Sequence, residues 1–191
     1  MKRASRAHAG FTLIEVIVVI AVITLLAGVV VPMVASYSNE GRVAKILSII
    51  DAVRSGAQRH YVDTGRMATE YSGSTYTQDR FHELSRTQKY SGWKGPYIDH
   101  PLTQGDHPFG GQIYMYENLV GGPARPNGFV LTGTGGSTTT GSGQFVGFSA
   151  VPEDVAKKVD AALDRNIPGD WKSFGRVEYV NGYVCVYLLQ P

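Results

Sequence analysis

Residues 11–35 form one apolar block in which Glu15 is the only charged side chain. About 20 apolar residues are enough for a helix to cross a bilayer, so this block predicts a membrane-spanning helix. The ten residues before it carry three basic side chains, and basic flanks stay on the cytoplasmic side. We therefore expect a single-pass membrane protein with its N-terminus in the cytoplasm.

The block does not look like an ordinary secretory signal. It is too long for a signal core, and residues 36–42 lack the small-residue cleavage site that such signals carry. A plain signal anchor is the simplest alternative, but Glu15 argues against it. A carboxylate inside a membrane helix costs roughly 2.5 kcal/mol or more and needs a partner. Small Gly10 would give a protease access to the backbone, and a cut after it would leave a new amine close to Glu15.

The run Gly10-Phe11-Thr12-Leu13-Ile14-Glu15, followed by an unbroken apolar helix, resembles the N-terminal signature of prepilins. The resemblance implies that a prepilin peptidase cuts between Gly10 and Phe11 and methylates the new N-terminal Phe11. Residues 1–10 are then a cleaved leader. The implied partners are other copies of the chain, related pilins and pseudopilins, membrane lipid and an inner-membrane assembly platform.

A pairing of charges explains why Glu15 would be needed for assembly. The amine of one subunit can pair with Glu15 of its neighbour in an apolar filament core, which offsets the burial of both charges and sets the register. The alternative is that only the peptidase or the translocation machinery needs Glu15. Pro32 is expected to kink or locally melt the helix, because proline lacks an amide donor. In the resembled family the helix can loosen at this position in the filament.

The helix is predicted to continue as an amphipathic segment over residues 36–65. Apolar side chains recur at helical spacing along it: Ile46, Ile50, Val53, Ala57 and Tyr61. This face should pack on a globular head, and Gly65 should end the helix. From Phe11 to Val62 the helix would measure about 78 Å.

Residues 66–191 predict a β-rich head. Strand-like runs lie between turn signals: residues 112–116, 128–132, 144–148, 176–180 and 183–189. The last two flank Asn181-Gly182, a strong hairpin turn. Residues 152–164 predict a short helix, and the Gly/Ser/Thr tract 133–143 predicts a loop. The expected fold is α+β: a long N-terminal spine helix whose second half packs on a small antiparallel sheet.

Three segments of the middle of the chain resemble the major pseudopilin of type II secretion systems: residues 61–66, 92–98 and 107–114. His107 and Phe109 stand where Asp and Trp are usual in that family, and residues 121–191 form a long extension. Three interpretations stay open. A secretion pseudopilin is favoured by the Trp93 loop and the absence of a disulfide. A major or minor type IV pilin, serving adhesion, motility or DNA uptake, is favoured by the extension. A signal-anchored enzyme or binding domain is the third.

Composition and motifs argue against several other functions. Without the leader the chain has 15 basic and 16 acidic residues, which does not suit a nucleic-acid binder. Cys185 is the single cysteine, so the chain has no intrachain disulfide and no Cys-based zinc cluster, and we expect a buried thiol. His82-Glu83 begins like a zinc-protease motif, but Arg86 occupies the second histidine's place. We therefore expect no enzymatic activity and no cofactor.

Calcium is the one metal that the sequence leaves open. Asp160, Asp164 and Asp170 cluster at and after the end of the predicted late helix, and carboxylates are ligands that calcium prefers. Major pseudopilins often bind calcium in a C-terminal loop, so the resemblance adds to this hypothesis. The same aspartates also suit a solvated helix face, which we favour because the family's Asp-rich and Gly-rich loop pattern is missing.

Overall fold

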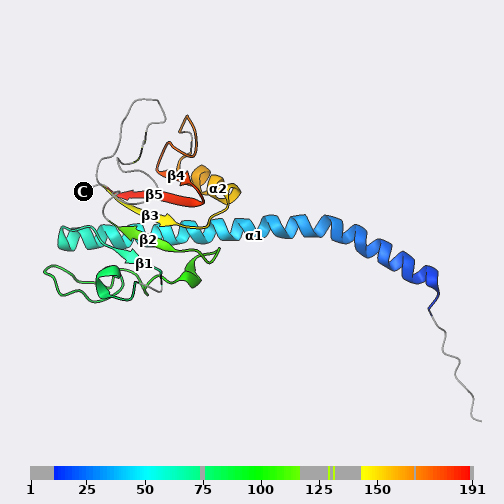
Figure 1. The fold of residues 1–191 in the computed structure, drawn as a ribbon, viewed down its shortest axis with the longest axis horizontal. Helices are drawn as coiled ribbons and strands as arrows, with labels where there is room; N and C mark the ends of the chain where they lie inside the picture. The colour runs from blue at the N-terminus through cyan, green and yellow to red at the C-terminus, as the bar shows by residue number, and fades with distance from the viewer. Residues whose placement is uncertain are drawn as a thin grey trace, which may run out of the picture. The chain divides into compact units, whose positions relative to one another are not determined.

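The computed structural model describes residues 11–73, 76–116, 129, 131, 143–165 and 167–189. Its described helices and strands occur in the following order: α1 (Leu13–Thr64), β1 (Glu70–Tyr71), β2 (Ile113–Tyr116), β3 (Gln144–Phe148), α2 (Glu153–Leu163), β4 (Val177–Val180) and β5 (Tyr183–Leu189). The chain divides after Glu40 into two compact units, so α1 contributes to both. The second unit, from Gly41 onward, is the head (Figure 1).

The head is built on one antiparallel sheet with the strand order β1-β2-β3-β5-β4. Strands β4 and β5 form the predicted hairpin, and Asn181 and Gly182 at its turn have φ values of 50° and 83°. Positive φ at both central residues is what this hairpin turn requires. The α+β prediction is therefore confirmed, with an apolar N-terminal helix, a second helix and a five-stranded sheet.

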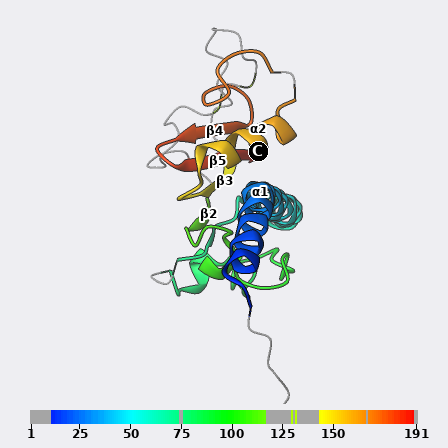
Figure 2. The same cartoon turned by 90° about the vertical axis from the view of Figure 1, so that its right-hand side faces the viewer.

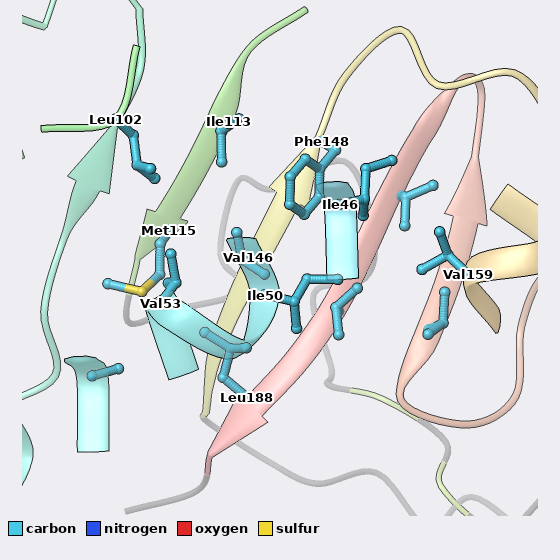
Figure 3. Packing of buried hydrophobic residues seen from close by; sticks show 14 of the residues in the cluster. Ile46, Ile50, Val53, Leu102, Ile113, Met115, Val146, Phe148, Val159 and Leu188 are labelled. Carbon is cyan, nitrogen blue, oxygen red and sulfur yellow. The ribbon is translucent and has the colours of Figure 1, made fainter. Parts of the chain in front are cut away.

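The second half of α1 lies along one face of the sheet (Figure 2). Four of its five predicted core residues are fully buried, and Tyr61 alone is only partly so. Figure 3 shows Ile46, Ile50 and Val53 of this helix among side chains from the sheet. Residues of α2 complete the same cluster: Val155, Ala156 and Val159. Each large apolar side chain buried here contributes roughly 1.5–3 kcal/mol, so this face holds α1, α2 and the sheet together.

The opposite face of the sheet carries a second, mainly aromatic cluster. Four of its members alternate along the strands with those of the main core, as pleated strands require: Tyr114, Phe145, Cys185 and Tyr187. Phe129 packs onto them from outside the strands. Cys185 is buried as predicted, and burial raises the pKa of its thiol to about 12. The thiol is therefore protonated at neutral pH and poorly reactive.

Both outer edges of the sheet are occupied by other parts of the head. At β1, Glu70 forms a bridge to His82, and the Glu83 amide donates to the Thr69 carbonyl at 2.8 Å. At β4, the Tyr179 amide donates to the Lys172 carbonyl at 3.0 Å. Unpaired edge strands readily bind strands of other chains. These contacts therefore use backbone groups that would otherwise be open to such pairing.

The structure corrects two predictions about the sheet. A strand was expected at residues 128–132, yet the two described residues there, Phe129 and Leu131, are not in a strand. Phe129 instead packs its ring on the outer face of the sheet, 5.6 Å from the ring of Tyr187. In addition, the two-residue strand β1 was not predicted. The rest of the 133–143 tract, apart from Gly143, lies outside the described residues.

Candidate processing and assembly site

The beginning of α1 is organised by Thr12 and Glu15. The amide and the hydroxyl of Thr12 both donate to Glu15 Oε2, at 2.8 and 2.7 Å. The Glu15 amide lies 3.4 Å from Thr12 Oγ1 in return. This reciprocal arrangement is a capping box, which satisfies backbone donors that the first turn of a helix leaves open. Sequence reasoning missed it, although the Thr-x-x-Glu spacing was visible.

The capping box changes which partners the Glu15 carboxylate needs from a neighbouring subunit. A carboxylate at the start of an apolar helix needs hydrogen-bond donors. In this chain Thr12 supplies two of them from within the same subunit. Thr12, the residue after Phe11, therefore already holds the Glu15 carboxylate in a fixed orientation. A neighbouring amine would approach the carboxylate in that orientation.

The helix that follows presents apolar side chains all round. Leu13–Val31 is the stretch of the described chain that is long and apolar enough to cross a membrane, with a mean hydropathy of 3.0. None of it is buried within the chain, and Phe11 just before it is 88% exposed. Such a continuous apolar surface indicates a partner surface or a membrane that covers it.

Comparison with known proteins agrees with this arrangement. Residues 5–31 match the family model described as the prokaryotic N-terminal methylation motif. The chain carries the type IV pilin and pseudopilin motif. No curated protein matches the chain. No solved structure matches it either.

The motif supports a type IV pilin-like or pseudopilin substrate of prepilin peptidase and implies assembly with other pilins. Its apolar helix fits the anchor of a single-pass inner-membrane protein. Gly10 lies outside the described residues, whereas Phe11 lies just ahead of α1. The cut between Gly10 and Phe11, the methylation of Phe11 and the role of Glu15 in register stay predictions.

The helix α1 continues without a break through Pro32. Local melting at this proline is therefore absent from the single subunit. Loosening of the helix in an assembled filament is a separate prediction, because neighbouring helices would change the surroundings of the freed carbonyl group.

The three aspartates of the calcium hypothesis do not form one site. Asp164 is buried at the end of α2, where its Oδ2 accepts the Val177 amide at 2.7 Å. Asp170 is exposed and accepts hydrogen bonds from the Lys172 amide and the Ser173 hydroxyl in its own turn. Across the described residues no group of three or more Asp, Glu, His or Cys side chains is placed to hold a metal ion. The geometry thus gives the calcium hypothesis no support.

Asp160 and Asp164 form a carboxylate pair with an unusual electrostatic character. Each has a buried Oδ1 without a hydrogen-bond partner among the described residues. Burial, together with the nearby charge of Asp164, raises the pKa of Asp160 to about 6. Burial also raises the pKa of Asp164, although the Val177 amide opposes that shift. A proton on Asp160 therefore stabilises the head, and ionisation near neutral pH destabilises it.

We expect Asp160→Asn to stabilise the head at pH 8 and to have little effect below about pH 4. The folded pKa lies above the unfolded value of 3.8, so the proton-bound form gains stability as the pH falls through about 6. The gain at pH 8 should be on the order of 1 kcal/mol, because Asp160 is partly screened by solvent. Urea unfolding of both chains between pH 4 and pH 8 measures it.

Asp170→Asn is the matched control, because Asp170 is exposed and bonded only within its own turn. It should show no gain at any pH. A different result would favour calcium: added calcium would stabilise the wild-type chain, and Asp160→Asn would remove that stabilisation.

Proposed function

We propose that this chain is a structural subunit of a type IV-pilus-like filament and, within that class, a pseudopilin of a type II secretion system. The observation that carries the proposal is that two of the three pseudopilin-like segments meet at the end of α1, while the third packs against an earlier part of the same helix. Two of them, residues 61–66 and 92–98, are in direct contact. The third, residues 107–114, forms a turn that leads into β2.

The loop of residues 92–98 is fixed to α1 through Asp63. Lys94 Nζ lies 2.9 Å from Asp63 Oδ1, and the Tyr97 hydroxyl donates to Asp63 Oδ2 at 3.1 Å. Gly92, with φ +88°, packs so closely on the Asp63 carbonyl that any side chain would overlap it. The Asp63 side chain thus binds this loop, and the backbone at Asp63 leaves no room for a side chain at position 92, which supports the resemblance in these two segments.

His107 explains how this chain can lack the usual aspartate of the third segment. Its Nδ1 accepts the amides of Phe109 and Gly111, at 3.1 and 3.2 Å. Burial lowers the pKa of His107 to about 4, so the ring is neutral at pH 7 and Nδ1 is free to accept. A carboxylate could accept the same two amides. The ring of Phe109 in turn lies 4.8 Å from the guanidinium of Arg42, so it anchors the turn to α1.

The extension of residues 121–191 was the feature that favoured a pilus subunit. In the head, β3, β4 and β5 all come from it and supply three of the five strands. It is therefore part of the common sheet instead of an added module, and it does not favour a pilus over a secretion system.

We propose a structural role and not an enzymatic one. An open hollow of about 470 Å³ lies beside the end of α1. Its charged side chains are engaged with the head itself: Asp63 pairs with Lys94, and Arg59 donates to the Tyr97 carbonyl. These contacts support a structural role for the charged side chains, which hold the loop of residues 92–98 against α1.

Two experiments test the proposal at its two levels. Mass spectrometry of the mature chain should find an N-methylated Phe11 at the N-terminus. An intact Met1, or a cut after Ala35, would exclude the filament class and leave a signal-anchored domain. Deletion of the gene should then retain exported proteins in the periplasm and leave surface pili unchanged. Loss of adhesion, motility or DNA uptake with normal secretion would instead identify a pilus subunit.

A further inference from the structure

Two ionisable side chains that are twelve residues apart meet inside the head. Glu70 on β1 is fully buried, and the side chain of His82 is only 5% exposed. His82 Nδ1 lies 3.0 Å from Glu70 Oε1. Buried ionisable groups are costly unless they are paired and hydrogen-bonded, so the surroundings of this pair define its protonation.

The contacts of the pair require one shared proton. His82 Nε2 lies 2.7 Å from the carbonyl oxygen of Tyr76, which can only accept, so Nε2 carries a hydrogen. On the other side, Glu70 accepts the amides of Leu84 and Leu102 at 3.2 and 3.4 Å, and the Ser85 hydroxyl at 2.9 Å. Nδ1 and Oε1 then need a second proton between them, whichever of the two atoms holds it.

These bonds join three separate parts of the head. Glu70 belongs to the edge strand β1, residues 76–85 form the segment that covers this edge, and Leu102 belongs to a later loop. If the shared proton is lost, a carboxylate and a nitrogen lone pair face each other in a buried place. The repulsion and the unpaired charge would both act to separate the covering segment from β1.

We propose that the Glu70–His82 pair is a proton-dependent latch, which fastens residues 76–85 and Leu102 to β1 and releases them at alkaline pH. The inference does not depend on the proposed function of the chain. The chemical step is the transfer of the shared proton to solvent hydroxide, and no other bond changes. Burial raises the pKa of Glu70, while hydrogen bonds from His82 and Ser85 oppose that shift.

The other charged groups near the latch are engaged elsewhere in the described part of the head. Glu83 accepts the Thr69 amide at 2.7 Å. Arg86 lies 3.5 Å from Asp79, and His100 lies 3.4 Å from Asp106 in the loop after Leu102. The residue of β2 opposite Glu70 is the apolar Met115. Glu70 and His82 are therefore the two groups whose protons decide the state of the latch.

Amide hydrogen exchange of the full chain in detergent micelles tests the latch directly. The Leu84 and Leu102 amides donate to Glu70, so their protection factors report whether it is closed. We expect protection of both amides to be at least about tenfold lower near pH 9 than near pH 6, while amides of the β3–β5 ladder stay unchanged. Equal protection at the two pH values would overturn the proposal.

Three variants separate the latch from general loosening. His82→Asn keeps an N–H donor toward Glu70 but removes the imidazole that shares the proton, so the pH difference should disappear. Glu70→Gln should abolish it as well, and this variant still decides the question if His82→Asn loses protection in the β3–β5 ladder. His100→Asn, at an exposed histidine, should keep the pH difference of the wild-type chain. A pH difference that persists in Glu70→Gln contradicts the latch.

Discussion

Glu15→Ala is expected to abolish filament assembly while the head stays folded. The substitution removes the one charge of the apolar segment and leaves a neighbouring amine without a partner in a nonpolar environment. An unpaired charge there costs roughly 2.5–3.5 kcal/mol per subunit on insertion scales. Because every subunit of a filament repeats this cost, growth should fail. Sedimentation and electron microscopy of sheared filaments measure assembly, and circular dichroism in detergent measures the head.

Glu15→Gln separates the two roles that Glu15 can have. Glutamine can still complete the capping box with Thr12, but it has no charge. If pairing with the amine sets the register, Glu15→Gln should fail like Glu15→Ala. Normal assembly of Glu15→Gln would show that capping alone is needed. Glu40→Ala, which removes an exposed carboxylate outside the apolar block, is the control and should assemble normally. Mass spectrometry must show that all variants are cut alike.

Gly147→Ala is expected to destabilise the head by about 2 kcal/mol or more. Gly147 on β3 lies directly opposite Tyr114 on β2, and the tyrosine ring covers the glycine. A methyl group would overlap atoms of that ring. Overpacking of a full core typically costs about 1–3 kcal/mol. Thermal unfolding of the full chain in detergent should show a lower melting temperature by several degrees.

Gly41→Ala is the matched control, because a methyl group at this helical glycine would meet no atom within 4 Å beyond the adjacent backbone of its own helix. It should stabilise α1 by roughly 0.5–1 kcal/mol, as alanine does in helices. A second test uses Tyr114→Ala in the Gly147→Ala background, which empties the space that the methyl group needs. If the double variant shows the sum of the two single effects, the proposed contact is not the cause.

The helical parts of the fold follow from local patterns in the sequence. The spacing of Ile46, Ile50, Val53 and Ala57 predicted the buried face of α1, because one side of a helix repeats every three to four residues. Asn181-Gly182 predicted the hairpin, because few residue pairs adopt positive φ at both positions. Such signals act over a few residues, so they can be recognised before the rest of the fold is known.

The errors concern residues whose structure is decided by distant contacts. β1 has two residues, too few for any periodicity, and exists because it pairs with β2 more than 40 residues later. Phe129 resembles a strand residue because it is apolar, yet it serves to cover the outer face of the sheet. For His82 the sequence showed only an incomplete zinc-protease motif and no partner, whereas in the structure its partner is Glu70.

The N-terminal motif and the aspartates near α2 could be predicted from the sequence to different degrees. The Gly10–Glu15 run predicted the N-terminal motif of type IV pilins and pseudopilins, and the matched methylation motif covers these residues. The capping box could have been found from the spacing of Thr12 and Glu15. The aspartates after α2 could not be separated from a metal site by sequence, because proximity in the chain does not show where each carboxylate points. In the structure Asp170 turns to its own loop and Asp164 to the Val177 amide.

The occupied edges of the sheet have a consequence when many heads are packed at high local concentration. Heads that coat a filament would be held against one another for as long as the filament lasts, a condition under which exposed strands fuse into continuous β-structure. Here the Glu70–His82 bridge and the Tyr179–Lys172 hydrogen bond keep the backbone of each head engaged with itself. These contacts reduce the number of edge backbone groups through which adjacent heads could pair. Contacts between heads would then depend more on side chains, and a subunit could separate from its neighbours without first breaking a shared β-sheet.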